Sequence, residues 1–180
     1  MKVRLTTFIA AMLVLAFFLP TSCKTAYNAD PQQRTMDSIA FLTAQKLIQG
    51  KGFMLSGDQL SIDNSPFFNV TSNTNFIVVE GNGATVQISP GIGAGPNGVG
   101  GITFQGEVSD FKFDTSRKDA VATFRFRANG GSGDVRIVLY KNSNKATAYV
   151  NATFYRGKAQ LQGQILPLGG TQIMEGTTRR

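Results

Sequence analysis

The stretch that decides the fold is AVATFRFRANGGSGDVRIVL, residues 120–139. Its side chains alternate between two sets. In the first half, one set is apolar and consists of Ala120, Ala122, Phe124 and Phe126, and the other is partly charged and consists of Val121, Thr123, Arg125 and Arg127. The segment NGGSG at 129–133 then supplies a turn, and Val135, Ile137 and Leu139 resume the alternation. A period of two places successive side chains on opposite faces of a strand, and a short Gly/Asn turn joins antiparallel neighbours. The stretch therefore predicts a hairpin with one apolar face and one partly charged face.

The same period of two extends over most of the chain beyond Gly52. Residues 53–62 predict a short strand pair or one interrupted strand, and residues 76–88 predict a hairpin around a Gly-Asn-Gly turn. Further turn residues at 141–144 separate two more alternating runs, and 159–165 forms the last run. Because short turns cannot join parallel strands, the pattern predicts an antiparallel meander of seven to nine strands.

One long run changes its alternation part of the way along. Ile102, Phe104 and Val108 occupy even positions, whereas Phe111 and Phe113 occupy odd ones. A strand can keep all five side chains on one face only if an extra residue is inserted. The sequence therefore predicts a β-bulge near Ser109-Asp110.

A helix is expected before the strands, at residues 35–49. Its apolar positions recur at helical spacing and are Met36, Ile39, Ala40, Thr43, Leu47 and Ile48. Thr35 is the expected N-cap, and Gly50 and Gly52 end the run. The expected fold is mainly β (α+β), with this amphipathic helix covering an opening of a curved sheet, half-barrel or lipocalin-like barrel; the alternative is a two-sheet sandwich.

The first residues resemble a secretory signal. Lys2 and Arg4 precede an apolar run at 8–19, which is too short for a span of roughly 20 residues, and Cys23 follows small residues. Since a single exported thiol has no disulfide partner, a bacterial lipoprotein is predicted, with acylation of Cys23. The expected organisation is a signal peptide at 1–22, a flexible tether at 23–34, one β-rich domain at 35–168 and a frayed tail at 169–180.

Composition excludes several classes of protein. The chain has no histidine and one cysteine, so zinc sites and histidine-dependent triads are excluded, and no cofactor, metal or catalytic residue is expected. Removal of residues 1–22 leaves 16 basic and 11 acidic residues, a net charge of +5. These basic residues do not cluster as they do in proteins that bind nucleic acid, so no such partner is expected.

The glycine loop GAGPNG at 93–98 has the spacing of a dinucleotide-binding loop. Such a loop requires a following helix, whose N-terminal N–H groups hold the pyrophosphate. Here alternating residues follow, and Pro96 removes one donor. The loop is therefore predicted to be a long connection between strands.

Candidate binding residues are Arg125 and Arg127 on one strand face and Arg136 on the neighbouring strand. Together they could grip a carboxylate or phosphate, and the alternative is a solvated outer face. Candidates for exposed aromatic anchors are Phe67, Phe68, Tyr149 and Tyr155, although packing in the core is the commoner fate of such residues. The acidic residues that could form a catalytic pair are Asp58, Asp63, Glu80, Glu107, Asp110, Asp114, Asp119 and Asp134.

Three segments of the chain are distinctive: NFIVVEGNGATVQI, then GPNGVGGITFQGEVSDFKF, then NSNKATAYVNATF before a glutamine-rich strand. Together they resemble a domain of unknown function found in lipoproteins of Bacteroidetes. The resemblance covers residues 36–166 and implies export, anchoring and a β-rich fold, with no catalytic residue to carry over.

The sequence thus predicts a non-enzymatic binding or interaction module, held to the membrane by a lipid anchor and bound to an unidentified protein or small molecule. The alternatives are a lipocalin-like carrier of an apolar or anionic molecule and a small carboxylate-dependent enzyme acting on glycans. Because Lys24 and no acidic run follow Cys23, the expected location is the outer membrane, facing the periplasm.

Overall fold

One helix and ten strands occur in the part of the chain that the computed structural model describes, residues 30–91, 102–153, 158–169 and 178–179. They are α2 (Pro31–Gln49), β1 (Gly52–Ile62), β2 (Phe68–Asn69), β3 (Phe76–Glu80), β4 (Gly83–Ile88), β5 (Ile102–Asp114), β6 (Ala120–Ala128), β7 (Gly131–Leu139), β8 (Lys145–Ala152), β9 (Lys158–Leu166) and β10 (Thr178–Arg179).

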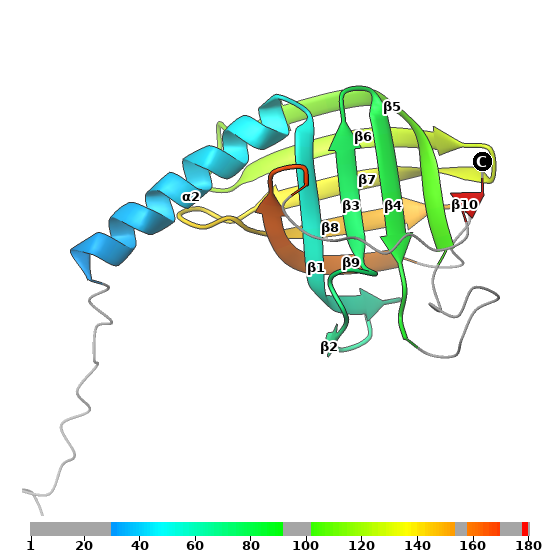
Figure 1. Cartoon of the computed structure of the whole chain (residues 1–180), viewed down its shortest axis with the longest axis horizontal. Coiled ribbons are helices and arrows are strands. Elements are labelled where there is room, and N and C mark those ends of the chain that lie inside the picture. The colour runs from blue at the N-terminus through cyan, green and yellow to red at the C-terminus, as the bar shows by residue number, and fades with distance from the viewer. Residues whose placement is uncertain (1–29, 92–101, 154–157, 170–177, 180) are drawn as a thin grey trace, which may run out of the picture. The chain divides into compact units, whose positions relative to one another are not determined.

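Eight of these strands close into an antiparallel barrel (Figure 1). Consecutive strands pair with each other from β3 through β9, and β1 pairs with both β3 and β9. Strands β2 and β10 are additions, paired with β1 and β5. The predicted mainly β fold and the barrel are confirmed, and the two-sheet sandwich is wrong because no open edge separates two sheets among these eight strands.

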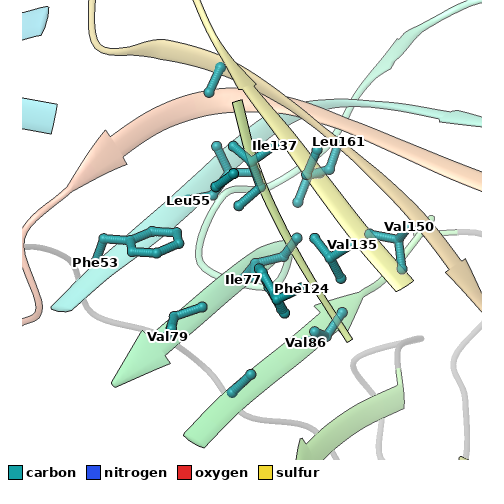
Figure 2. Close-up of a cluster of buried hydrophobic side chains, with 14 of the residues drawn as sticks. Phe53, Leu55, Ile77, Val79, Val86, Phe124, Val135, Ile137, Val150 and Leu161 are labelled. Atoms are coloured by element: carbon teal, nitrogen blue, oxygen red, sulfur yellow. The ribbon is translucent and has the colours of Figure 1, made fainter. Parts of the chain in front are cut away.

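The period of two determines which side chains fill the barrel. Phe124 on β6 and Val135 and Ile137 on β7 are at most 3% exposed, whereas Arg125 and Arg136 are exposed. Figure 2 shows that these three buried side chains face side chains from the opposite wall of the barrel, among them Ile77. An eight-stranded barrel is just wide enough for side chains to fill, and its described side chains do so here.

Helix α2 begins four residues earlier than the sequence predicted. Pro31 is its first residue, a position where the missing N–H costs nothing. Thr35 lies inside the helix, where its hydroxyl donates to the Pro31 carbonyl at 3.0 Å, so its prediction as N-cap is wrong. Residues 31–34 of the predicted tether therefore belong to the helix.

The buried face of α2 also differs from the prediction. Ala44 and Ile48 are 1% and 0% exposed and join the barrel core, whereas Met36 and Ile39 are 65% and 54% exposed. The helix packs against β1, β7 and β9 through its C-terminal half (Figure 1). Apolar spacing predicted the helix correctly, but Met36 lies in its first turns, away from the strands, and Ile39 lies on the side opposite Ala44 and Ile48.

Both predicted irregularities are present in the strands. The register of β5 against β6 shifts between Ser109 and Lys112, and Asp110 has a φ of 55°. Residues 53–62 form a single strand whose register against β9 shifts between Gly57 and Gln59. The bulge in β5 turns Lys112 outward and lets Phe113 pack against the core.

The tail from 169 was predicted to be frayed, yet Thr178 and Arg179 pair in parallel with Thr103 and Phe104 of β5. That prediction is therefore wrong for these two residues, because backbone pairing needs no apolar pattern in the sequence. The predicted signal peptide with Cys23, the glycine loop at 93–98 and Tyr155 lie outside the described residues. Within the described part, no helix has the length and apolar character needed to cross a membrane.

The closest backbone approach at the β1–β9 seam predicts a sensitive position. A Cβ on Gly163 would lie 1.9 Å from the Ser56 carbonyl oxygen, whereas one on Gly52 would meet nothing within 4 Å. We expect Gly163→Ala to lower the free energy of unfolding by at least about 2 kcal/mol, since the strands must separate. Gly52→Ala is the control and should change it by less than about 0.5 kcal/mol in urea unfolding. Equal effects of the two substitutions would contradict this account of the seam.

Candidate functional site

A hollow of about 560 Å³ lies across β5 to β9, and we call it the outer hollow. Two rows of outward side chains wall it, each row following the cross-strand register. The first row is Lys112, Thr123, Arg136, Tyr149 and Gln160, and the second is Arg125, Asp134, Asn151 and Lys158. Side chains opposite one another in an antiparallel pair lie close together, so residues far apart in the chain meet here.

The floor of the outer hollow shows that it lies outside the barrel. Between the two rows runs a third row, Phe124, Val135, Val150 and Ala159, whose members are at most 3% exposed because their side chains point inward. Only the backbone of this row can face the hollow. No residue of β3 or β4, the opposite wall, lines it among the described residues.

Two irregular segments complete the rim. The bulge of β5 contributes Asp110 and Lys112. On the other side, the Lys158 N–H donates to the Asp63 carboxylate and the Asp63 N–H donates to the Lys158 carbonyl, each at 2.9 Å. Asp63 and Asn64 both have positive φ, a conformation that Asp and Asn tolerate. This turn places Asn64 at the rim, with its Oδ1 3.4 Å from Gln160 Nε2.

The outer hollow carries a net positive charge. Its four basic side chains outnumber its two acidic ones, Asp110 and Asp134. Arg125 Nε lies 3.0 Å from Asp134 Oδ1, and both side chains are more than half exposed, so this pair is a weak one. The Arg136 guanidinium lies 5.7 Å from the ring centre of Tyr149, a cation–π distance. Lys112, Arg136 and Lys158 have no acidic partner within the described part of the chain.

Two of the three arginines that the sequence predicted as binding residues lie together in the structure. Arg125 and Arg136 line the outer hollow, whereas Arg127, opposite Ser132, lies beyond it. Sequence reasoning missed Lys112 and Lys158. These two lysines could be identified only from the pairing of the strands. Lys112 reaches the outer face because of the bulge in β5, and Lys158 lies opposite Asn151 in the register of β9 with β8.

The predicted aromatic anchors differ in their surroundings. Tyr149 is 39% exposed and lines the outer hollow, while Phe67 is equally exposed but lies in the segment before β2. Phe68 is partly buried against the core. Tyr149 is therefore the aromatic ring that accompanies the charged groups.

Of the acidic residues considered for catalysis, Asp110 and Asp134 share the outer hollow and the other six do not line it. Hydrogen bonds from the Ser116 hydroxyl and N–H lower the pKa of Asp114, so this carboxyl stays ionised and is a poor general acid. Within the described ranges, no three His, Cys, Asp or Glu side chains gather as a metal site would require.

The outer face of the barrel is not equally open all round. Over β4 and β5, Gln87 and Thr103 are completely buried, and Gln87 Nε2 donates to the Thr74 carbonyl at 3.0 Å. The Thr103 hydroxyl bonds to Gln87. The segment before β3 thus covers that side, while the outward rows of β6 to β9 remain accessible.

Comparison with known proteins identifies the family to which the chain is similar. A family model described as Domain of unknown function (DUF4251) matches residues 36–165. A solved crystal structure of a DUF4251 family protein from Bacteroides eggerthii is similar, with 31% identity and a TM-score of 0.66, over 77% of this chain and 94% of that one. A search of the curated proteins found no match.

The exposure of the Arg125–Asp134 pair predicts a small structural role. We expect Asp134→Asn to change the free energy of unfolding by less than about 1 kcal/mol, because water screens the pair. Ile137→Ala, at a fully buried position on the same strand, should cost about 2 to 5 kcal/mol and shows that the assay is sensitive. Chemical unfolding measures both, and a loss above about 2 kcal/mol for Asp134→Asn would make the pair structural.

Proposed function

The chain belongs to the DUF4251 family, and from that premise we propose that it is a non-enzymatic binding module, held by lipid in a bacterial envelope. Its ligand carries a carboxylate or phosphate group and is bound in the outer hollow. The ligand is either a small molecule or part of a protein or glycan.

The observation that carries this proposal is the set of cations in the outer hollow that have no acidic partner there. Lys112, Arg136 and Lys158 line one open concave surface. An Arg guanidinium binds carboxylate and phosphate with two parallel hydrogen bonds, and that of Arg136 lies 5.7 Å from the ring centre of Tyr149. Asn151 and Gln160 add amide groups that match hydroxyl or peptide partners.

A carrier role inside the barrel has less support from the described residues. Phe53, Phe126 and Leu161 are fully buried and occupy the interior with the rest of the core. A lipocalin-like carrier needs an enclosed pocket of a few hundred Å³ in that space. The packing therefore favours the outer hollow over the lumen as the binding site.

The anchoring part of the proposal rests on the sequence. Cys23 follows a short apolar run and small residues, and it is the sole cysteine of the chain. Acylation would account for a thiol that has no disulfide partner. A single acyl chain binds a membrane only marginally, whereas several acyl chains attach a protein stably. The proposed location is the outer membrane, with the domain in the periplasm.

Binding of anions should depend on Arg136 and not on Arg127. We expect the chain without residues 1–23 to bind inorganic phosphate or galacturonate and not glucose, as followed by amide chemical shifts. Arg136→Ala should weaken this binding about tenfold or more, since charge-assisted hydrogen bonds are lost. Arg127→Ala, on the same face but outside the hollow, is the matched control, and Asp134→Asn should strengthen binding because it frees Arg125.

Equal effects of Arg136→Ala and Arg127→Ala would contradict the assignment to the outer hollow. Shifts confined to inward residues such as Val135 would favour the lumen instead. A glycan-hydrolysing activity that survives purification and is lost in Asp110→Asn would replace the binding module with the enzyme alternative.

Acylation is tested separately. In its bacterial host, the full chain should incorporate labelled palmitate and sediment with the outer membrane, because the signal directs acylation to Cys23. Cys23→Ala should lose the label and leave the membrane, and Ser22→Ala, which keeps a small residue before the cysteine, should behave like the wild type. Protease added to intact cells should spare a periplasmic domain, and rapid digestion would place it on the cell surface.

A further inference from the structure

Helix α2 carries a second apolar row that the barrel does not cover. Met36, Ile39 and Leu42 are 65%, 54% and 53% exposed. Residues three apart on a helix are neighbours, so the three side chains form one continuous row. They are the most exposed large apolar side chains in the described part of the chain.

This row is separate from the face that holds the helix to the barrel. At 3.6 residues per turn, Ile39 and Leu42 lie on the opposite side of the helix from Ala44 and Ile48, which are buried. The barrel therefore fixes the row pointing outward. Burying it needs something outside the domain.

The charges around the row fit a lipid surface. Lys46 lies one turn beyond Leu42 on the same side, and an ammonium there suits anionic headgroups. Asp37 is the helix's single acidic residue; it is partly buried on the barrel side and accepts a hydrogen bond from Gln33 Nε2 at 2.7 Å. No carboxylate therefore interrupts the exposed row.

The chain length between the helix and the acylation site sets a second constraint. Seven residues separate Cys23 from Pro31. Even fully extended, eight Cα steps span at most about 29 Å, so α2 begins within that distance of the acyl chains. Ile39 follows about 12 Å further along the helix.

We propose that α2 lies along the membrane, with Met36, Ile39 and Leu42 inserted at the boundary between headgroups and acyl chains. This inference rests on the proposed acylation of Cys23. The acyl chains hold the protein at the bilayer, and the row then fixes its orientation, as in other interfacial amphipathic helices.

The test uses the acylated mature protein, purified and placed in vesicles of phosphatidylethanolamine and phosphatidylglycerol that contain nitroxide-labelled lipids. Because Cys23 is the sole native cysteine, Ile39→Cys provides one free thiol for an environment-sensitive fluorophore. We expect blue-shifted emission that the nitroxide lipids quench. The control is Asn129→Cys, an exposed turn position between β6 and β7, which should show neither effect. Adding Met36→Ser and Leu42→Ser to Ile39→Cys should reduce quenching to the level of the Asn129 probe.

Mass spectrometry of Cys23 in the same samples distinguishes failure of the acyl anchor from failure of α2 docking. If the protein is acylated and the Ile39 probe is quenched no more than the Asn129 probe, docking of α2 is overturned and anchoring stands. A protein without acyl chains overturns the anchoring and, with it, the docking. A blue shift that grows with protein density and does not respond to nitroxide lipids means that a second copy covers the row, which also overturns the proposal.

Discussion

The pairing of β1 with β9 is the interaction on which the rest of the structure depends. It joins the first and the last strand of the barrel, and without it both would expose an unpaired edge. The seam runs from Met54 opposite Leu166 to Ile62 opposite Ala159. It depends on two glycines: a Cβ on Gly163 would collide with the Ser56 carbonyl, and a Cβ on Gly57 would collide with the Leu161 side chain. The same seam brings Asp63 against Lys158, so the part of the rim that Asn64 forms depends on the closed barrel.

Local pattern predicted much of this fold, and long-range alignment explains what it missed. The switch from Val108 to Phe111 and Phe113 located the bulge, because a change of alternation has a single geometric remedy. The spacing of apolar residues predicted the helix, but not which face is buried, since that depends on where the strands lie beneath it. Nothing local pairs β1 with β9. The closed barrel therefore remained one of several alternatives.

In the candidate site, too, local pattern predicted some residues, and others depend on long-range strand alignment. Arg125 and Arg136 could be found because one strand and its hairpin partner carry them. Lys112 needs the bulge, and Lys158 needs the register of the last strand, so neither could be assigned from local sequence. Fold alone does not identify function, because barrels of this kind serve many purposes. In this barrel the described side chains fill the interior, while the outer face carries cations whose backbone positions are set by paired strands.

Orientation connects the outer hollow with α2. The helix packs at the end of the barrel where β1 begins and β9 ends, and the hollow includes the start of β9 and the last residues of β8, at the other end. In the proposed docking of α2 through Met36, Ile39 and Leu42, Tyr149 and Lys158 therefore lie at the end of the barrel remote from the helix. In the proposed arrangement, the end of the barrel remote from α2 is left for a soluble ligand or for one carried by a neighbouring envelope component.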